Sequence, residues 1–335
     1  MNSIAADKKI RYGIIGFGAF AERAIMPAIR KTANSELLAI QKRSPDMAKR
    51  KAEEYGIPYH YESVEELVSS PHVDAVFIVS ANSRHHPDTL AAASQKKHVL
   101  VEKPMAMNFH EGREMIDACR RHNVLLMVGH MLRFSPLLQR MKEIISSGEL
   151  GTITFARSEF IYDAGISQRG WLWDKSIAGG GPLFDIAVHC LDAIRFVLED
   201  TVSEVQSILR PSESLSLVEK SSHLSLRTTR GVMCSIYSSF EAPYRRTFIE
   251  FIGTKGTISA YDFTPSNISV VLEKQTGVSG LIGKKEQERI IIPDLYEREI
   301  AHFSECIING TEPVIDSFSA LHNQEILDRA LQNSR

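Results

Sequence analysis

The chain has 335 residues, of which 43% are hydrophobic, and this supply of apolar side chains is enough for two packed domains. Its formal net charge of -2 provides no general field that would attract nucleic acid or an anionic membrane surface. The four cysteines are widely spaced, and no segment resembles a signal peptide core or the roughly 20 apolar residues of a membrane span. We therefore expect a cytoplasmic protein that binds neither nucleic acid nor membrane.

The first part of the chain alternates short apolar runs with amphipathic stretches, a pattern typical of parallel strands covered by helices on both faces. One helix is expected to begin at Pro45 and end at Gly56, another to begin at Pro87, and a third to be capped by Asn108. Strands are expected at residues 11–16, 37–40, 74–80, 98–102 and 123–129. This alternation predicts an α/β, doubly wound Rossmann domain over residues 1–130.

A different pattern follows a helix predicted over residues 136–147. Apolar or alternating runs occur at 152–162, 223–229, 232–240, 246–253 and 256–261, and further helices are expected over 182–198, 296–308 and 318–332. We predict that residues 131–335 form an α+β domain with a large, open, mostly antiparallel sheet covered on one face. This domain is expected to bind substrate and to carry the contacts between subunits.

The first predicted strand leads into a turn of the form G-x-G-x-x-A. Gly16 permits a tight turn, Gly18 lets the backbone approach a pyrophosphate, and Ala21 keeps the next helix close to the sheet. The alternative is a tight turn that binds nothing. Because the helix start also presents N–H groups, we predict a dinucleotide site that includes Gly16, Phe17, Gly18, Ala19 and Phe20.

The end of the second predicted strand indicates which dinucleotide is preferred. Lys42, Arg43 and Ser44 place two cations and a hydroxyl where a carboxylate would repel a 2′-phosphate. The spacing therefore favours NADP(H) over NAD(H), and a solvated basic turn is the alternative.

The strand at 98–102 ends at the carboxyl edge, where open α/β sheets bind ligands. Glu102 ends the strand, and Pro104 stops it while restricting the backbone of Lys103 to an extended form. Beside a nicotinamide, the ammonium of Lys103 could bind a substrate hydroxyl and stabilise developing negative charge on its oxygen. A surface ion pair between Glu102 and Lys103 is the alternative.

The helix predicted over 182–198 carries Asp185, His189 and Asp192 on one face. A neutral His189 could take the proton from a substrate hydroxyl while hydride leaves the same carbon, and Asp185 could orient the imidazole or bind another hydroxyl. Val188 and Phe196 lie on or beside this polar stripe, which favours an enclosed surface. An amphipathic helix with a solvated face is the alternative.

Two further features are candidates for substrate contact. Arg133 could contact substrate or cofactor, or could form an ion pair that joins the domains. Tyr162, Arg169 and Trp171 could stack on a sugar ring and bind its hydroxyls, or could anchor a loop or subunit contact. The scattered histidines have no carboxylate at metal-ligand spacing, so we predict no metal site.

Residues 74–104 and the helix with the D-x-x-x-H pattern resemble the family of glucose-fructose oxidoreductase and inositol dehydrogenase, known as Gfo/Idh/MocA. The E-K-P tripeptide at residues 102–104 matches, as do Asn82 and His85, whereas Ser80 and Ala81 stand where the family usually has Thr and Pro. The resemblance implies that the cofactor lies near Ser80, Asn82, His85, Glu102, Lys103 and Arg133. It also implies that Lys103 is the catalytic lysine and meets His189 in a cleft between the domains.

The same resemblance implies a dehydrogenase or reductase that acts on the CH–OH group of a sugar, cyclitol or related polyol. Two other functions stay open: a redox-assisted lyase or glycosidase that retains its cofactor, and a dinucleotide sensor without catalysis. The family's second sheet commonly packs between subunits, and the apolar residues over 246–261 support a homodimer or homotetramer.

Overall fold

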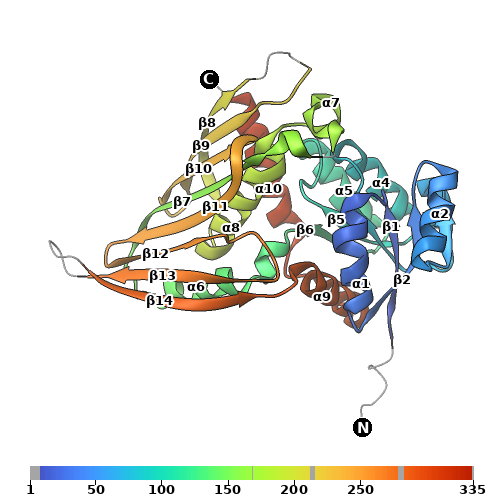
Figure 1. The fold of residues 1–335 in the computed structure, drawn as a ribbon, viewed down its shortest axis with the longest axis horizontal. Helices are drawn as coiled ribbons and strands as arrows, with labels where there is room; N and C mark the ends of the chain where they lie inside the picture. Colours follow the sequence, from blue (N-terminus) through green and yellow to red (C-terminus); the bar gives the residue numbers. More distant parts are fainter. Residues whose placement is uncertain (1–7, 168, 212–215, 278–282, 334–335) are drawn as a thin grey trace, which may run out of the picture. The chain divides into compact units, whose positions relative to one another are not determined.

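The computed structural model describes residues 8–167, 169–211, 216–277 and 283–333. The chain divides into two compact units (Figure 1), the first made of residues 1–131 and 296–321 and the second of residues 132–295 and 322–335. The sequence-based division gave all residues after 130 to the second domain, whereas residues 296–321 pack with the first unit.

The first unit contains a six-stranded parallel sheet with the order β3-β2-β1-β4-β5-β6, which confirms the predicted doubly wound fold. Its strands are β1 (Ile10–Ile15), β2 (Ser35–Gln41), β3 (Tyr59–Tyr61), β4 (Ala75–Ile78), β5 (His98–Glu102) and β6 (Leu126–Gly129). The strand β3 was not predicted, because three residues are too few to show a period. The strand order reverses between β1 and β4. Sheets of this kind bind ligands at such a point of reversal.

The helices of the first unit begin and end largely where local signals place them. They are η1 (Ala21–Ile25), α1 (Met26–Lys31), α2 (Pro45–Tyr55), α3 (Val64–Ser69), α4 (Asn82–Ser94), α5 (Phe109–Arg121) and α9 (Leu295–Asn309). Gly56 ends α2 in the left-handed conformation, and the side chain of Asn108 accepts a hydrogen bond from the N–H of Glu111. The predicted start at Pro87 is wrong, because Pro87 lies inside α4, where it removes one backbone donor.

The second unit contains an eight-stranded sheet with the order β14-β13-β12-β11-β7-β10-β9-β8. Its strands are β7 (Ile153–Asp163), β8 (Val202–Arg210), β9 (Ser221–Thr228), β10 (Met233–Ser239), β11 (Glu241–Gly253), β12 (Gly256–Tyr261), β13 (Ile268–Thr276) and β14 (Lys284–Ile292). Every pair is antiparallel except β10 with β7, so the predicted mostly antiparallel sheet is confirmed. The outer strands β8, β13 and β14 were not predicted, because many of their residues are polar and exposed.

One face of this sheet is covered by helices, as predicted. Burial alternates along β9 and β12, α8 (Val188–Leu198) packs on β7, and α6 (Pro136–Ser146) packs on β14; Figure 1 shows both helices behind the strands. The other elements of the second unit are η2 (Met131–Phe134), η3 (Ala164–Ile166), η4 (Gly170–Trp173), α7 (Lys175–Ala178) and η5 (Leu183–Ala187). The helix α10 (Ser317–Gln332) begins in the first unit and continues in the second.

Within the described residues, no helix is long and apolar enough to cross a membrane.

Candidate functional site

The turn after β1 has the geometry that a dinucleotide requires. Gly16 has a φ of +84°, and a Cβ at this position would lie 2.6 Å from the Cα of Ser80. A Cβ on Gly18 would meet nothing nearer than the carbonyl oxygen of Gly16, at 3.8 Å. The first glycine is therefore needed by the protein itself, whereas the second leaves free space against the backbone, as a bound pyrophosphate would need.

Gln41, which sequence reasoning missed, holds this turn from the end of β2. Its Oε1 accepts a hydrogen bond from the N–H of Gly16 at 3.1 Å, and its Nε2 donates to the carbonyl of Glu62 at 2.9 Å. Its carbonyl also accepts from the N–H of Phe17 at 2.9 Å. The only signal in the sequence was a polar side chain at the end of an apolar strand.

The two phenylalanines of the turn contact other aromatic rings. Phe17 is buried, with its ring centroid 6.1 Å from that of Tyr55, and Phe20 lies edge-on to Tyr296 at 5.7 Å. Ala19 is exposed, and the helix that follows opens with the π-helical turn η1. Contacts with other aromatic rings therefore explain why phenylalanine occurs at both positions. The small residues Gly18 and Ala19 leave the backbone of the turn accessible.

The basic stretch after β2 is partly engaged. The ammonium of Lys42 donates to the carbonyl of Phe17 at 3.0 Å, so this side chain supports the glycine turn. Arg43 and Ser44 are exposed, and the hydroxyl of Ser44 makes no cap hydrogen bond to α2. The stretch from Gln41 to Ser44 contains no carboxylate.

Side chains after β4 and β5 join two neighbouring loops. The ring of the buried His85 has Nδ1 2.8 Å from the carbonyl oxygen of Pro104 and Nε2 3.1 Å from that of Ser80. Burial lowers the pKa of His85 to about 4, so the imidazole is neutral near pH 7 and can donate to only one of these carbonyls. Asn82, the first residue of α4, is buried as well.

Asp88 anchors the start of the same helix. Its buried carboxylate accepts a hydrogen bond from the hydroxyl of Ser80 at 2.9 Å and one from Arg84 at 2.7 Å. The Ser80 hydroxyl thus donates to Asp88. This contact ties the loop after β4 to α4.

The E-K-P motif lies at the carboxyl end of β5. Glu102 is 7% exposed, and its Oε2 accepts a hydrogen bond from the backbone N–H of Lys103 at 3.2 Å. The side chain of Lys103 is half-buried, and the Lys103–Pro104 peptide bond is cis. These features locate Lys103 at the ligand-binding edge of the first unit's sheet.

In the second unit, Tyr162, Arg169 and Asp185 form one hydrogen-bonded cluster. Arg169 donates to both carboxylate oxygens of Asp185 at 3.1 Å, and the hydroxyl of Tyr162 donates to Asp185 at 2.9 Å. The carboxylate raises the pKa of Arg169, and burial is the main cause that raises the pKa of Tyr162. Asp185 is therefore fixed in place as an ionised partner of Arg169.

His189 lies on the same helix, after the π-helical turn η5. His189 is 9% exposed, and the centroid of its imidazole is 6.2 Å from that of the Phe160 ring on β7. The stripe of Asp185, His189 and Asp192 is buried rather than solvated, as the neighbouring apolar residues predicted. π-Helical turns are frequent at functional sites.

Arg133 forms an ion pair within the second unit. Its guanidinium makes hydrogen bonds of 2.6 to 3.1 Å to both carboxylate oxygens of Asp192, which also accepts from Asn323 at 2.8 Å. Both partners of this ion pair belong to the second unit.

The aromatic loop before the helix makes cation–π and ring contacts. The guanidinium of Arg169 lies 5.9 Å from the ring of Trp171, and Trp173 packs edge-on against Phe240 at 5.5 Å. Both tryptophans are half-buried. Arg169 thus links Trp171 to the Asp185 cluster.

Across the parts of the chain that the structure describes, no group of three or more histidine, cysteine, aspartate or glutamate side chains is arranged to hold a metal ion.

Both halves of the chain match known family models. Residues 10–130 match the model of an oxidoreductase family with an NAD-binding Rossmann fold, and residues 138–259 match the GFO/IDH/MocA C-terminal domain.

Similar proteins include sugar-converting enzymes. The chain is 32% identical to 1,5-anhydro-D-fructose reductase from Ensifer adhaerens over 90% of both chains. It is 26% identical to D-xylose 1-dehydrogenase (NADP(+)) 2 from Haloferax volcanii, over 96% of this chain and 97% of that protein. The crystal structure of an aldose-aldose oxidoreductase from Caulobacter crescentus in complex with glycerol is similar with a TM-score of 0.87, 27% identity and 97% coverage of both chains.

Proposed function

Since the chain belongs to the Gfo/Idh/MocA family of oxidoreductases, we propose that it transfers hydride between NAD(P) and a secondary alcohol or ketone of a sugar, cyclitol or related polyol. The observation that carries this proposal is the enclosed stretch of α8 and η5, where a buried imidazole follows a carboxylate held by Arg169 and Tyr162. The names of the relatives, which include a fructose derivative and xylose, support a sugar-like substrate.

His189 is the proton-transfer group of the proposed reaction. In oxidation its neutral imidazole takes the proton of the substrate hydroxyl as the C–O bond becomes C=O, and in reduction the imidazolium returns that proton to the oxygen. Asp185 is held ionised, so it supplies a fixed acceptor for a second hydroxyl or for the imidazole N–H. The half-buried Trp171 provides an apolar surface for the face of a sugar ring.

The first unit supplies the cofactor site in this proposal. Gly16, Gly18 and Ala19 face the pyrophosphate, with Asn82 and Glu102 near the nicotinamide end. The bound nicotinamide supplies the hydride acceptor or donor. Lys103 stabilises negative charge that develops on the substrate oxygen.

Turnover of a substrate panel tests the proposal. The purified protein is mixed with polyols, aldoses and ketoses, and the absorbance of NADPH and NADH is followed in both directions. We expect Lys103→Met and His189→Ala each to lower kcat by about 10²-fold or more while cofactor affinity changes little. Ordinary turnover in both variants would exclude the assigned roles.

The same experiment separates the two other candidate functions. A lyase or glycosidase that oxidises its substrate transiently would form product while the total reduced cofactor stays constant, with the nucleotide retained on the protein. A sensor would bind the nucleotide without turnover of any substrate.

A preference for NADP(H) is part of the proposal, and the exposed Arg43 and Ser44 after β2 support it. We expect Arg43→Ala to weaken NADPH binding about tenfold and to leave NADH binding nearly unchanged, because only NADPH carries the 2′-phosphate. Fluorescence titration with both nucleotides measures the two affinities. Arg50→Ala, which changes another arginine on α2, is the matched control. An equal effect on both nucleotides would contradict the preference.

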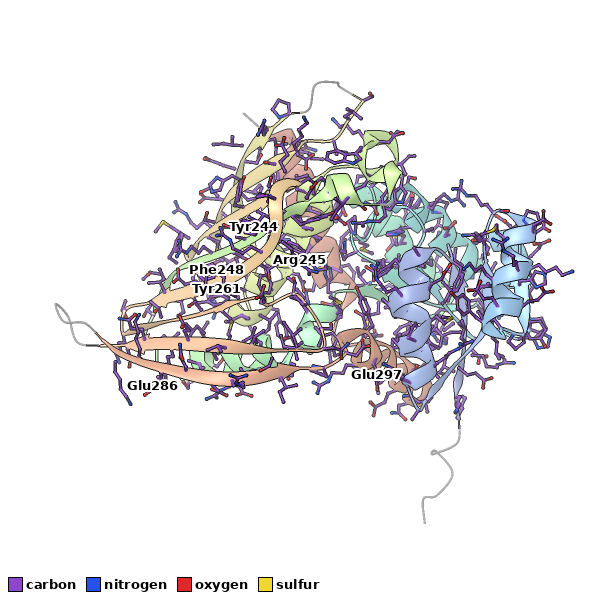
Figure 2. All side chains as sticks on the ribbon, in the orientation of Figure 1. Tyr244, Arg245, Phe248, Tyr261, Glu286 and Glu297 are labelled. Atoms are coloured by element: carbon purple, nitrogen blue, oxygen red, sulfur yellow. The ribbon has the colours of Figure 1, made fainter. Side chains whose placement is uncertain are left out.

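Self-association through the open face of the second sheet is also proposed, as a homodimer or homotetramer. On this face, Phe248 of β11 and Tyr261 of β12 lie opposite each other with ring centroids 4.7 Å apart (Figure 2). Tyr261 is 58% exposed, and Met233 and Tyr237 on β10 are exposed as well. Such a set of exposed apolar residues is typical of a protein interface.

Light scattering after size-exclusion chromatography tests the association. Tyr261→Lys should shift the mass toward the monomer, because it places a charge inside an apolar contact. Val314→Lys changes an exposed apolar residue elsewhere in the chain and should leave the mass unchanged. A monomeric unmodified protein would exclude the interface.

We assign the protein to the cytoplasm. The composition and the four cysteines, all free and buried, support a reducing compartment. Cell fractionation tests the assignment.

A further inference from the structure

A buried carboxylate from a distant segment holds the start of the helix that carries Asp185 and His189. Glu219 lies just before β9 and is 8% exposed. Its Oε1 accepts hydrogen bonds from the N–H of Gly181 at 2.9 Å and of Leu183 at 3.0 Å, and its Oε2 lies 2.9 Å from the same Gly181 nitrogen. These three contacts favour the ionised form of Glu219 and satisfy N–H groups that a helix start leaves unpaired.

No local residue provides this cap. Pro182, at the N-cap position of η5, makes no side-chain cap hydrogen bond, so the acceptor comes from Glu219, 36 to 38 positions later in the chain. Gly181 is required for the close approach, because a Cβ there would lie 2.2 Å from the carbonyl oxygen of Glu219. The glycine-rich entry to this helix therefore serves the contact with Glu219.

The segment around Glu219 also holds the aromatic loop. The N–H of Lys175 donates to the carbonyl of Ser216 at 2.9 Å, and the N–H of Val218 donates to that of Trp173 at 3.2 Å. Phe240 N–H donates to the carbonyl of Lys220 at 3.0 Å, which joins the segment to the sheet. One short segment thus contacts the loop with the tryptophans, the helix start and the sheet.

We propose that Glu219 is a positioning residue that sets both the place and the proton affinity of His189, an inference that rests on the proposed role of His189 in proton transfer. Leu183, whose N–H is bound by Glu219, precedes His189 by six residues, or about 9 Å along a helix axis. A carboxylate at that distance favours the imidazolium form. Removing its charge lowers the pKa of His189 by roughly 0.7 to 1.4 units at an effective dielectric constant of 20 to 40.

Two other charged groups on the same helix have partners other than Glu219. Asp185 remains bound to Arg169 and Tyr162, and Asp192 remains bound to Arg133. Burial raises the pKa of Glu219, and the amide donors and the charge of Lys175 on α7 oppose that shift. A change in the titration of His189 therefore reports on Glu219.

Two variants separate the effect of the charge of Glu219 from the effect of its side-chain length. Glu219→Gln keeps the length of the side chain and an acceptor oxygen but removes the charge, whereas Glu219→Asp keeps the charge and shortens the side chain. Glu204→Gln, on β8 of the same unit and in an exposed pair with Arg227, is the matched control.

The readouts require no substrate. The pKa of His189 is measured by NMR titration of protein labelled at histidine ¹³Cε1, with the resonance identified by its absence in His189→Gln. Hydrogen exchange is measured by mass spectrometry on peptides that cover residues 181–189. We expect Glu219→Gln to lower the pKa of His189 by roughly 0.7 to 1.4 units. Glu219→Asp should speed exchange at residues 181–183 about tenfold or more without a comparable pKa change.

Activity adds a second expectation. With a substrate found in the panel, the acid limb of the kcat profile in Glu219→Gln should shift to lower pH by the same amount, while the affinity for NADPH stays unchanged.

An unchanged His189 titration in Glu219→Gln together with unchanged exchange in Glu219→Asp would overturn the inference and leave the proposed function standing. Loss of folded protein in both variants, with Glu204→Gln folded, would also overturn it, because Glu219 would then support the unit as a whole. Full activity of His189→Ala would instead reject the proposed function, whatever Glu219 does to the titration.

Discussion

At the scale of single residues, Glu299 shows how burial changes the chemistry of a carboxyl group. Its side chain on α9 is fully buried, and neither carboxyl oxygen has a hydrogen-bond partner among the residues that the structure describes. Burial, with a smaller contribution from the negative charge of Glu102, raises the pKa of Glu299 well above its ordinary value. The folded protein therefore binds this proton more tightly than the unfolded chain does.

The raised pKa makes stability depend on pH in a defined direction. Because the folded state holds the Glu299 proton more tightly, the free energy of unfolding decreases as pH rises above the unfolded value of about 4.5, until the folded pKa is passed. We expect Glu299→Gln to be stabilised relative to the unmodified protein at pH 8 but not at pH 5, by on the order of 1–2 kcal/mol.

Urea unfolding at several pH values measures this difference. Glu305→Gln changes an exposed glutamate on the same helix and should leave the pH dependence as it is. The difference in the free energy of unfolding between Glu299→Gln and the unmodified protein should change from pH 5 to pH 8. A constant difference would show that the pKa of Glu299 is not raised.

At the scale of elements, the turn between β1 and η1 contains two glycines in different surroundings. Gly16 has a positive φ and no room for a Cβ beside Ser80, whereas the position of Gly18 is open. The fold therefore requires a glycine at position 16, whereas packing leaves position 18 open. The sequence alone does not distinguish the two glycines, because both belong to the same G-x-G-x-x-A pattern.

The two glycines should respond differently to alanine. Gly16→Ala is expected to lower the free energy of unfolding by at least about 1–2 kcal/mol, because an L side chain is strained at this φ and contacts Ser80. Gly18→Ala should keep the stability but weaken NADPH and NADH binding roughly tenfold or more, because its methyl group occupies the space for the pyrophosphate.

Thermal unfolding and nucleotide titration on both variants check this contrast. Gly56→Ala at the end of α2 is a control for the effect of a positive φ away from the turn. If Gly18→Ala bound both nucleotides normally, the pyrophosphate would have to lie elsewhere.

At the scale of the whole molecule, the Rossmann unit is completed by a late part of the chain. Tyr12 of β1 is hydrogen-bonded to Ser304 of α9 at 2.8 Å, and the side chain of Asn34 donates to the carbonyl of Ala301 at 3.0 Å. Leu321 is part of the hydrophobic core that contains Val76 and other residues of β4 and β5. Residues 296–321 thus cover apolar surface of the sheet that would otherwise face water.

We expect a fragment of residues 1–131 to lack a cooperative thermal transition and to bind NADPH weakly, because the surface under α9 is exposed in it. Adding a peptide of residues 296–321 should restore part of the binding, as measured by fluorescence and circular dichroism. A peptide of the same composition in scrambled order is the control. Cooperative unfolding of the fragment alone would show that the late segment is dispensable.

Local patterns were sufficient for most elements and for the sheet edge at which the site is proposed. The strand β5, the helix α2 and the cap at Asn108 were predicted because apolar period, proline, glycine and asparagine act within a few residues of one another. Pro87 misled the prediction, because the helix α4 accommodates a proline that a local signal treats as a start. The strands β8, β13 and β14 were missed, because exposed outer strands carry too few apolar residues to show a period.

The sequence by itself therefore determined the two kinds of sheet, the glycine turn, the E-K-P edge and the pairing of Asp185 with His189 on one helix, all of which depend on neighbours in the chain. Only the tertiary structure decided which partner each polar side chain has. Arg133 is held by Asp192, Gln41 holds the turn at Gly16, and Glu219 caps a helix from 36 to 38 residues away. A hydrogen bond depends on distance in space, and folding brings these distant residues within 3.1 Å of each other.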